Sequence, residues 1–330
     1  MFFDTSFLVL RKRVPYELIE ATQSIMTSAY LYLLSRGTHL KEGTTEVCST
    51  NNRVNVEKVC KESELTNSNA KLKHVGEVLL DKRILITGAS RGLGAVVAHA
   101  FAERGARIAL MARSQDKLEQ VRMSCMNPEQ HVSIPVDLLK MNDIEPAVQK
   151  AQAFLSGIDV VIHAAGGGLG LKEDFLMHED FTKLFVLNLG AVAEINKLVS
   201  AEMKKRGSGN LVHVGSIASS EGVGSVGYNT VKAALAAYVR SLGRELNRFN
   251  VIATGILPGG FISPGNAMSR LKESNPSAYN AFIEERLPRH VMGNAQELIP
   301  MLILLSSDDA SMMGGCLVPI DAGEGRAYIQ

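Results

Sequence analysis

The chain of 330 residues carries 35 Lys and Arg against 34 Asp and Glu, which gives a formal net charge of +1. This balance argues against nucleic acid or an anionic membrane as the main partner. Apolar residues make up 46% and charged residues 21%, a mixture that can bury a core and is not typical of disordered chains. The cysteines, Cys48, Cys60, Cys125 and Cys316, are scattered and have no histidine at ligand spacing, so we expect neither a metal site nor a disulfide framework.

Residues 1–80 differ in composition from the rest of the chain. The pattern predicts an amphipathic helix over Pro15–Ser35, whereas polar Lys41–Lys73 is typical of a linker or a loosely ordered arm. The extension is either an interaction element or a poorly ordered addition, and both interpretations stay open. The N-terminal apolar run lacks a cleavage site, and Ile25–Leu34 is too short to span a bilayer. We therefore expect a cytoplasmic protein with an extension over 1–80 and one catalytic domain over 81–330.

From Lys82 onward, short apolar runs alternate with helical stretches. The predicted strands are Arg83–Thr87, Arg107–Met111, His131–Val136, Ile158–His163, Asn210–Gly215, Asn250–Gly255 and Cys316–Ile320. The predicted helices are Gly92–Arg104, Ser114–Cys125, Asn142–Leu155, Phe181–Arg206, Gly227–Phe249 and Ala295–Ser306. Because parallel strands need crossover connections, this alternation predicts an α/β fold, a doubly wound parallel sheet (Rossmann fold) of about seven strands.

A glycine-rich turn follows the first predicted strand and leads directly into a helix. Its residues are Thr87, Gly88, Ala89, Ser90, Arg91, Gly92, Leu93 and Gly94. Glycine at these positions lets the backbone turn tightly and approach a pyrophosphate, which the N-terminal amides of the helix then face. A tight turn without a ligand would look similar by itself, but the position on the first strand of a doubly wound pattern favours a dinucleotide site.

Two arginines indicate which dinucleotide this is. An acidic residue about 20 positions after the glycines would bind the adenosine ribose, but Arg113 stands in that region and no carboxylate does. Arg113 and Arg91 could together bind a 2′-phosphate, which favours NADP(H) over NAD(H), unless both are ordinary surface charges. Asp137 follows the third strand and could accept from the adenine amino group or cap the next helix. Ala165 and Gly166 would let the cofactor lie against the backbone.

The third group of candidate residues is Ser216, Tyr228 and Lys232. Tyr228 and Lys232 are four residues apart in a predicted helix and so share a face, while Ser216 ends the fifth strand. A phenol has an ordinary pKa near 10, and a neighbouring ammonium would lower it. The three side chains are thus expected to polarise a carbonyl group and to donate a proton to its oxygen.

From about Lys82 to Gly325 the sequence resembles the short-chain dehydrogenase/reductase family, most of all its NADP-dependent 3-oxoacyl-carrier-protein-reductase-like members. The residues that carry the resemblance are Thr87–Gly94, Asp137, Asn188, Ser216, Tyr228 with Lys232, and Pro258-Gly259 followed by Ser263. The resemblance implies that Asn188 kinks its helix and holds a water that passes protons to Lys232. It also implies that Lys232 binds the nicotinamide ribose and that Pro258, Gly259 and Ser263 line the nicotinamide.

Two features depart from the family pattern. His163-Ala164-Ala165-Gly166 stands where the family has Asn-Asn-Ala-Gly, so the Asn that normally braces the sheet is missing. The N-terminal extension also has no counterpart. The resemblance further implies that the helices Phe181–Arg206 and Gly227–Phe249 pack across a homodimer or homotetramer interface, and we interpret His178 and His213 as structural.

The sequence favours an NADP(H)-dependent enzyme that reduces a ketone, either a 3-oxoacyl thioester or a similar compound. A reductase or dehydrogenase of a sugar, nucleotide sugar, polyol or steroid is the alternative, and a non-catalytic cofactor-binding regulator is the alternative of another class. A lid is expected over Phe261–His290, with helices over Ala267–Glu273 and Ser277–Arg286. The lid's basic residues, Arg270, Lys272, Arg286, Arg289 and His290, would suit either an anionic substrate or a solvated surface, and we favour the surface slightly.

Overall fold

The computed structural model describes residues 46–48, 53–55 and 78–327, and the chain divides into two compact units, 1–72 and 73–330. The predicted helix over Pro15–Ser35 lies outside the described residues. In the first unit, β1 (Glu46–Cys48) pairs antiparallel with β2 (Arg53–Asn55). These two strands lie in the stretch for which the sequence predicted a linker.

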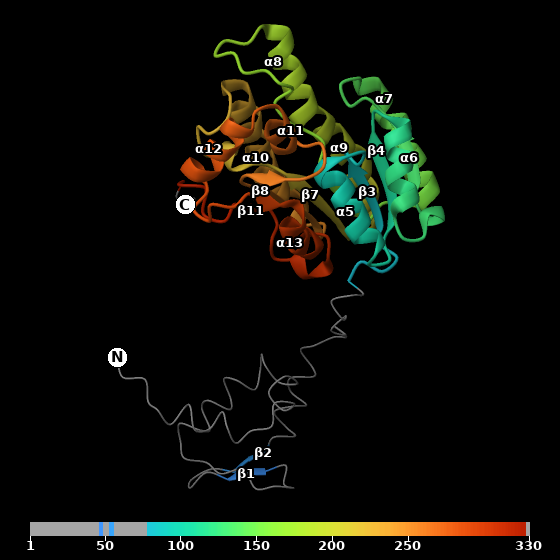
Figure 1. The fold of residues 1–330 in the computed structure, drawn as a ribbon. Coiled ribbons are helices and arrows are strands. Elements are labelled where there is room, and N and C mark those ends of the chain that lie inside the picture. The colour runs from blue at the N-terminus through green and yellow to red at the C-terminus, as the bar shows by residue number, and fades with distance from the viewer. Residues whose placement is uncertain (1–45, 49–52, 56–77, 328–330) are drawn as a thin grey trace. The chain divides into compact units, whose positions relative to one another are not determined.

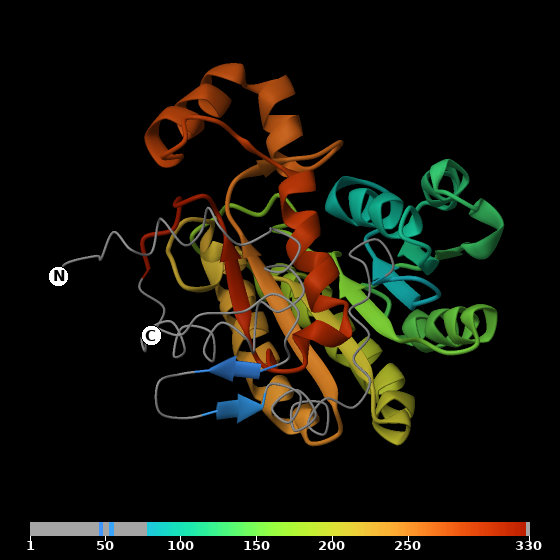
Figure 2. The ribbon, with the colours of Figure 1, turned by 90° about the horizontal axis from the view of Figure 1, so that it is seen from below.

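The second unit is built on one seven-stranded sheet. Its strands are β3 (Arg83–Thr87), β4 (Arg107–Ala112), β5 (Val132–Pro135), β6 (Val160–His163), β7 (Gly209–Val214), β8 (Val251–Pro258) and β11 (Leu317–Ile320). They lie side by side in the order β5-β4-β3-β6-β7-β8-β11, and every pair is parallel. The predicted doubly wound sheet of seven strands is therefore confirmed; Figure 2 shows β8 (orange) beside β11 (red) at one edge.

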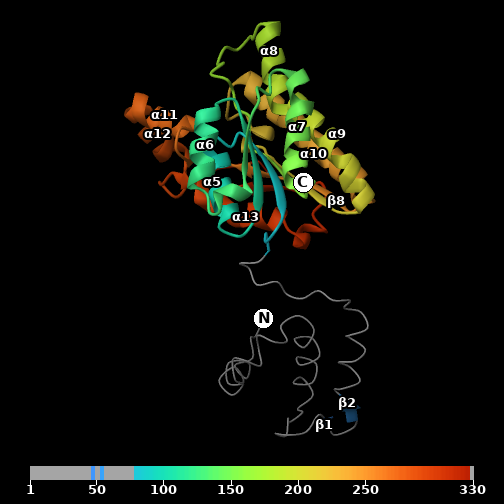
Figure 3. The ribbon, with the colours of Figure 1, turned by 90° about the vertical axis from the view of Figure 1, so that its right-hand side faces the viewer.

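Helices cover both faces of the sheet. The helices of one face are α5 (Gly92–Ala102), α6 (Gln115–Ser124) and α13 (Ile299–Leu305), and those of the other are α7 (Met141–Leu155), α9 (Ala191–Arg206) and α10 (Val226–Asn247). Figure 3 shows α5 and α6 on one side of the strands and α7, α9 and α10 on the other. The arrangement follows from the right-handed crossovers that parallel strands require.

Successive side chains of a strand point to opposite faces of the sheet, so each strand contributes to the core on both faces. Ile84 and Ile86 of β3 pack with the α5 face, whereas Leu85 between them packs with the α7 face. All three side chains are completely buried. Burying each such side chain stabilises the fold by about 1.5–3 kcal/mol. This explains why the strands are apolar at nearly every position.

The segment from His178 to Arg206 is one long helical stretch of high mean hydropathy, 1.4 over its most apolar window, and by length and composition alone it could cross a membrane. It consists of α8 (His178–Phe185), a π-helical turn over Val186–Gly190 and α9. The buried side chains of α9 belong to the core beneath the sheet, and this packing accounts for the apolar composition.

A lid extends from the carboxyl end of β8. It contains β9 (Phe261–Ile262), α11 (Ala267–Ser274), α12 (Pro276–Arg286) and β10 (Gly293–Asn294). The two short strands pair in parallel, which the sequence did not predict. Figure 1 shows α8, α11 and α12 toward the end of the sheet that is opposite α13. The remaining short 3-10 turns are Pro128–Gln130, Ile217–Ser219, Ala295–Leu298 and Asp308–Ala310.

Candidate active site

The candidate site lies where the chain leaves the carboxyl ends of β3, β6, β7 and β8. The order β4-β3-β6-β7 contains the switch point of the topology, because the chain crosses to one side of β3 for β4 and to the other for β6. Loops diverge at such a point and leave a crevice for a ligand. The loops here carry Gly88–Gly94, Ala164–Gly168, Ser216 and Pro258–Ser263.

The side chains of Ser216 and Tyr228 interact at this point. Ser216 follows β7, and its hydroxyl also accepts a hydrogen bond of 3.1 Å from the backbone N–H of Ala218, which begins a short 3-10 turn. Tyr228 lies in the first turn of α10. Burial raises the pKa of Tyr228, while the bond to Ser216 acts in the opposite direction. The phenol is therefore protonated at neutral pH and can donate.

Lys232 is 4% exposed, which is unusual for a lysine. Its Nζ donates to the carbonyl of Val214 over 3.0 Å and lies 5.7 Å from the centre of the Tyr228 ring. Burial lowers the pKa of Lys232 to about 8. Burial dominates the pKa of Tyr228 in this arrangement, and the ammonium of Lys232 donates to the sheet, so the lowering of the phenol pKa by Lys232 stays a prediction.

Asn188 occupies the π-helical turn and is 1% exposed. Its Nδ2 donates to the carbonyls of Leu184 (2.9 Å) and Gly167 (3.0 Å), and its Oδ1 accepts from the backbone N–H of Gly167 (3.0 Å). The side chain thus ties the irregular helix to the loop after β6. A Cβ on Gly166 would lie 2.9 Å from Asn188 Oδ1 and 3.4 Å from Lys232 Nζ, so both polar groups approach the same point.

The glycine-rich turn is held tightly against its surroundings. Gly88 has φ +70°, and a Cβ there would lie 2.8 Å from the backbone nitrogen of Ala165. A Cβ on Gly94 would lie 2.4 Å from the carbonyl oxygen of Gly88. Thr87 Oγ1 accepts a hydrogen bond of 3.2 Å from the N–H of Ala165. The turn therefore has the close backbone geometry of a pyrophosphate loop at the start of α5.

Ser263 has a buried hydroxyl that is available to pair with a ligand at this site. Its side chain is 5% exposed, and its Oγ has no hydrogen-bond partner among the described residues. A Cβ on Gly92 would lie 3.6 Å from that oxygen, and Gly92 N–H donates to the carbonyl of Pro264 over 3.0 Å. A buried hydroxyl normally has a partner. Since Ser263 faces the glycine-rich turn, the residues present fit a dinucleotide bound between the two segments.

The remaining cofactor candidates lie as follows. Arg91 and Arg113 are both exposed, and neither side chain has a hydrogen bond or ion pair to a described residue. Asp137 accepts from the backbone N–H of Leu139 over 3.2 Å. Helix α7 begins at Met141 with Lys140 as its N-cap, so the expectation that Asp137 caps this helix is wrong. Pro258 ends β8 and Gly259 follows it, bonded through its N–H to the carbonyl of Ile320 over 3.2 Å.

A polar network that includes His163 lies behind the site. The sequence did not predict this network, although His163 is one of the positions at which the chain departs from the family pattern. His163 Nε2 donates to Asn196 Oδ1 (2.8 Å), Asn196 Nδ2 donates to His213 Nε2 (3.0 Å), and His213 Nδ1 donates to the carbonyl of Thr254 (2.7 Å). The two imidazole rings stack with centroids 4.9 Å apart. Burial lowers the pKa of His163 to about 3 and that of His213 to about 4. His213 is thus structural, as expected.

The basic residues of the lid are engaged by other groups. Arg270 donates to the carbonyl of Gly265 over 2.5 Å, and Lys272 lies 5.7 Å from the ring centre of Tyr279. Ion pairs join Arg286 to Glu324, Arg289 to Glu297 and His290 to Glu284. Of the two interpretations of these charges, the geometry favours a paired surface over an anion-binding site.

A glycine turn of the pyrophosphate type at the switch point of the sheet, with Ser216, Tyr228 and Lys232 beside it, is the arrangement of a nicotinamide-dependent oxidoreductase. Comparison with known proteins narrows the class. Residues 82–274, more than half of the chain, match the family model described as short chain dehydrogenase. The chain belongs to the short-chain dehydrogenase/reductase family, whose members bind a nicotinamide cofactor and act on CH–OH or C=O groups.

Several relatives within the family are similar over most of their length. The chain is 30% identical over 257 residues to levodione reductase of Leifsonia aquatica, covering 75% of this chain and 96% of the relative. It is 24% identical over 253 residues to the 3-oxoacyl-[acyl-carrier-protein] reductase MabA of Mycobacterium avium, covering 76% and 92%. A crystal structure of levodione reductase superposes with a TM-score of 0.69 at 27% identity, covering 76% of this chain and all of that one.

Proposed function

We propose that the protein is an NADP(H)-dependent reductase of ketones in which Tyr228 is the proton donor. The observation that carries the proposal is buried Lys232, whose Nζ lies 5.7 Å from the centre of the Tyr228 ring, with Ser216 beside the phenol at the switch point of the sheet. Belonging to the family supports oxidoreductase chemistry in general. The cofactor preference, the substrate class and the residue roles are our inference.

Each side chain has one task in this proposal. When bound, the nicotinamide supplies a hydride to the carbonyl carbon. Ser216 and Tyr228 donate hydrogen bonds to the carbonyl oxygen, and Tyr228, whose raised pKa keeps it protonated, transfers its proton to that oxygen. Lys232 holds the ribose hydroxyls and, once its ammonium turns from Val214, stabilises the phenolate that remains.

The preference for NADP(H) rests on Arg91 and Arg113. They follow β3 and β4, which are neighbours in the sheet, and both guanidinium groups are exposed and free of described partners. Guanidinium groups match the geometry of phosphate oxygens. Ser90 and Leu93 complete the turn around the pyrophosphate, and Asp137 is left to contact the adenine.

The substrate that the site suits best is a ketone with an apolar body. Large apolar side chains are exposed on the segments that flank Tyr228: Leu169 44%, Phe175 95%, Met177 70%, Phe185 43% and Val226 55%. Gly168 belongs to the same loop as Leu169, and a Cβ there would lie 3.8 Å from the Tyr228 side chain. The lid's cations are engaged already, so they do not favour an anionic carrier such as phosphopantetheine over a neutral ketone.

The test is a panel of ketones assayed with NADPH and with NADH. We expect an alicyclic or alkyl ketone to turn over faster than acetoacetyl coenzyme A or L-sorbose, and NADPH to be preferred. Absence of turnover with every ketone would contradict the proposal and favour a non-catalytic regulator. Faster reduction of the sugar would favour the alternative of a sugar or polyol reductase.

Arg113→Ser sharpens the cofactor test. We expect the KM for NADPH to rise by about tenfold or more while the KM for NADH changes little, because only the 2′-phosphate loses a charge-assisted bond. Arg107→Ser, which removes an arginine from the opposite end of the same strand β4, is the matched control. An unchanged preference for NADPH over NADH in Arg113→Ser would show that Arg113 does not bind the 2′-phosphate.

Assembly and location remain predictions. We propose a homodimer or homotetramer in the cytoplasm, without nucleic acid or membrane as a partner. Light scattering of the full chain and of a chain lacking residues 1–80 would measure the assembly and show whether the extension contributes to it.

A further inference from the structure

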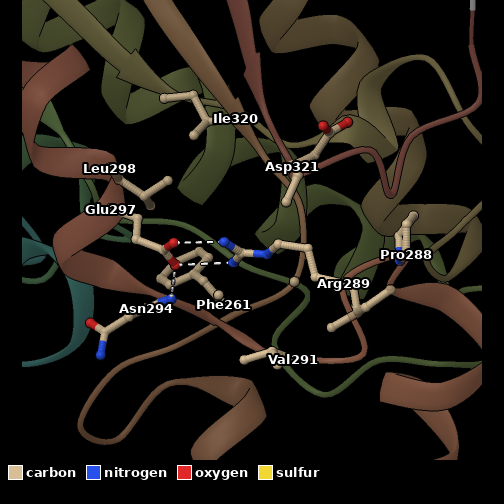
Figure 4. A pocket seen from close by; sticks show the side chains of 13 residues that line it. Phe261, Pro288, Arg289, Val291, Asn294, Glu297, Leu298, Ile320 and Asp321 are labelled. Atoms are coloured by element: carbon tan, nitrogen blue, oxygen red, sulfur yellow. Dashed lines mark hydrogen bonds and ion pairs between the residues drawn. The ribbon is translucent and has the colours of Figure 1, made fainter.

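The lid has a small apolar core of its own. Tyr279, Leu287 and Met292 are buried together, and they form a cluster separate from those on the two faces of the sheet. A cavity of about 270 Å³ lies between the lid's returning segment and the end of β11, lined among others by Pro288, Arg289 and Ile320 (Figure 4). Because packing is incomplete there, polar contacts must contribute much of the lid's attachment.

Two arginines on the lid make ion pairs with carboxylates of the main domain. Arg289 donates two bonds to Glu297, of 2.8 and 3.2 Å, and Figure 4 shows them running in parallel. Both side chains of this pair are nearly half exposed, at 42% and 48%. Arg286 pairs with Glu324 over 2.6 Å, and here the carboxylate side chain is only 3% exposed. Because the Glu324 carboxylate is buried, removing its partner would leave an uncompensated buried charge, so losing the second pair should cost more than losing the exposed pair.

Glu324 also contacts the backbone beside the proposed nicotinamide position. Its Oε2 accepts a hydrogen bond of 2.5 Å from the N–H of Gly260, and its Oε1 accepts from Arg286. A Cβ on Gly259 would lie 2.6 Å from the same Oε2. One carboxylate thus presses against the Gly259-Gly260 backbone and binds the lid helix α12 at once.

Arg286 extends the connection to the loop that carries the catalytic candidates. Its Nη1 donates to the carbonyl of Val223 over 3.3 Å, between Ser216 and Tyr228 in the chain. Its guanidinium carbon lies 5.0 Å from the ring centre of Phe282. Glu221 in the same loop accepts from the backbone N–H groups of Arg326 and Ala327, at 2.8 and 3.1 Å. The C-terminal segment therefore connects the lid to the Gly259-Gly260 backbone and to the loop between Ser216 and Tyr228.

We propose that Glu324 is a positioning residue that latches the lid over the substrate and fixes the Gly259-Gly260 backbone against the cofactor. The expected effect of Glu324 on turnover rests on the proposed function. The attachment of the lid through Glu324 is a property of the fold and does not depend on that function. Glu324 acts through Arg286 and Gly260 and touches no reacting atom.

Glu324→Gln and Glu324→Ala separate the two contacts of the carboxylate. The glutamine oxygen still accepts from Gly260, but the amide cannot pair with Arg286; alanine loses both contacts. Glu297→Gln is the comparison variant, since it weakens the pair of the other lid arginine and leaves both contacts of Glu324 in place. The first measurement is hydrogen exchange of peptides covering residues 267–286 in the full-length protein without ligand.

We expect amide exchange in these peptides to accelerate about tenfold in Glu324→Gln, more in Glu324→Ala and little in Glu297→Gln. Equal acceleration in Glu297→Gln and Glu324→Gln, or no acceleration in the latter, would overturn the latch. This readout needs no substrate, so it decides the latch even if no ketone turns over and the proposed function fails.

The second measurement is steady-state kinetics with NADPH and the ketone that the wild-type protein reduces fastest. We expect Glu324→Gln to raise the KM for the ketone about tenfold with little change in kcat, and Glu324→Ala also to raise the KM for NADPH. Glu324→Asp keeps the charge and should recover part of the lost affinity. A lower melting temperature with unchanged KM values would show a merely structural role and overturn the positioning role.

Discussion

Two polar clusters lie on the same part of the sheet, and they differ in burial and in which of their groups are hydrogen bonded. The first contains Ser216, Tyr228 and Lys232, and the second contains His163 and His213 with the amide that bridges them. Burial lowers the pKa of a cation in each cluster, to about 8 for Lys232 and to about 3 and 4 for the imidazoles. The same cause leaves a lysine that titrates near pH 8 and two histidines that are neutral at pH 7.

The difference teaches that burial by itself does not make a reactive site. In the histidine cluster, the side-chain amide of Asn196 is hydrogen bonded to both imidazole rings, and its Nδ2 also donates to the hydroxyl of Tyr238 (3.3 Å). One ring nitrogen of His163, Nδ1, has no partner among the described residues, but it is buried away from the loops. In the other cluster, the ammonium of Lys232 donates to Val214 with one of its three hydrogens, and the phenol of Tyr228 interacts with Ser216. The remaining donors of Lys232 and Tyr228 are therefore available to a substrate and a cofactor.

The largest expected effect is that of removing one phenolic hydroxyl from each cluster. Tyr228→Phe should lower kcat for ketone reduction by about 10³-fold, because a general acid contributes 10²–10⁴-fold. NADPH binding, followed by fluorescence titration, should remain nearly unchanged. Tyr238→Phe removes the same type of group from the histidine cluster and should retain most of the activity. Retention of the rate in Tyr228→Phe would refute the assignment of the proton donor.

The histidine cluster should make the fold sensitive to acid. Because the pKa values of His163 and His213 are lower in the fold than the ordinary 6.5, the unfolded chain binds more protons below that pH. The stability contributed by the neutral pair is present above pH 6.5 and is lost as the pH falls toward about 4 and 3. We expect a loss of about 6 kcal/mol, about 3 kcal/mol from each histidine, between pH 7 and pH 4 in urea unfolding.

The double variant His163→Asn with His213→Asn isolates this effect from the carboxylates, which also titrate in that range. Its stability at pH 7 will be lower, but its dependence on pH should be shallower than that of the wild-type chain. An equally steep dependence would assign acid unfolding to other groups.

Lys232 should impose a pH dependence on turnover. Its ammonium form predominates below about pH 8, so kcat/KM for the ketone should fall as the pH rises through that value. Lys232→Met should lower kcat/KM by about a hundredfold and abolish the break near pH 8. A break that persists in the variant would belong to a different group.

The smallest effect concerns the loop between the two clusters. Gly166→Ala should lower kcat/KM by about tenfold, since its Cβ would meet Asn188 Oδ1 at 2.9 Å and displace it or Lys232. Gly167→Ala is the matched control, because Gly167 also has a positive φ, +125°, but no described atom lies within 4 Å of its Cβ. Equal losses in both variants would point to backbone strain instead of displaced side chains.

Much of the architecture could be predicted because it depends on residues close together in the chain. Glycines 88 and 94, the apolar strand β3 and the four-residue spacing of Tyr228 and Lys232 are local signals, and the structure places them as expected. The lid helices α11 and α12 also lie where the pattern predicted them. The β9–β10 pairing was missed because each strand has two residues, too few for a periodic signal.

The sequence alone determined the class of fold and the chemical groups available at the site, because periodicity, turn-forming glycines and side-chain type are properties of short segments. Only the tertiary structure decided what those groups do. It turned Lys232 toward Val214, raised the pKa of Tyr228 and paired Arg286 with Glu324, 38 positions away. Charge and burial depend on neighbours that are distant in the chain, and these neighbours are known only when the chain is folded.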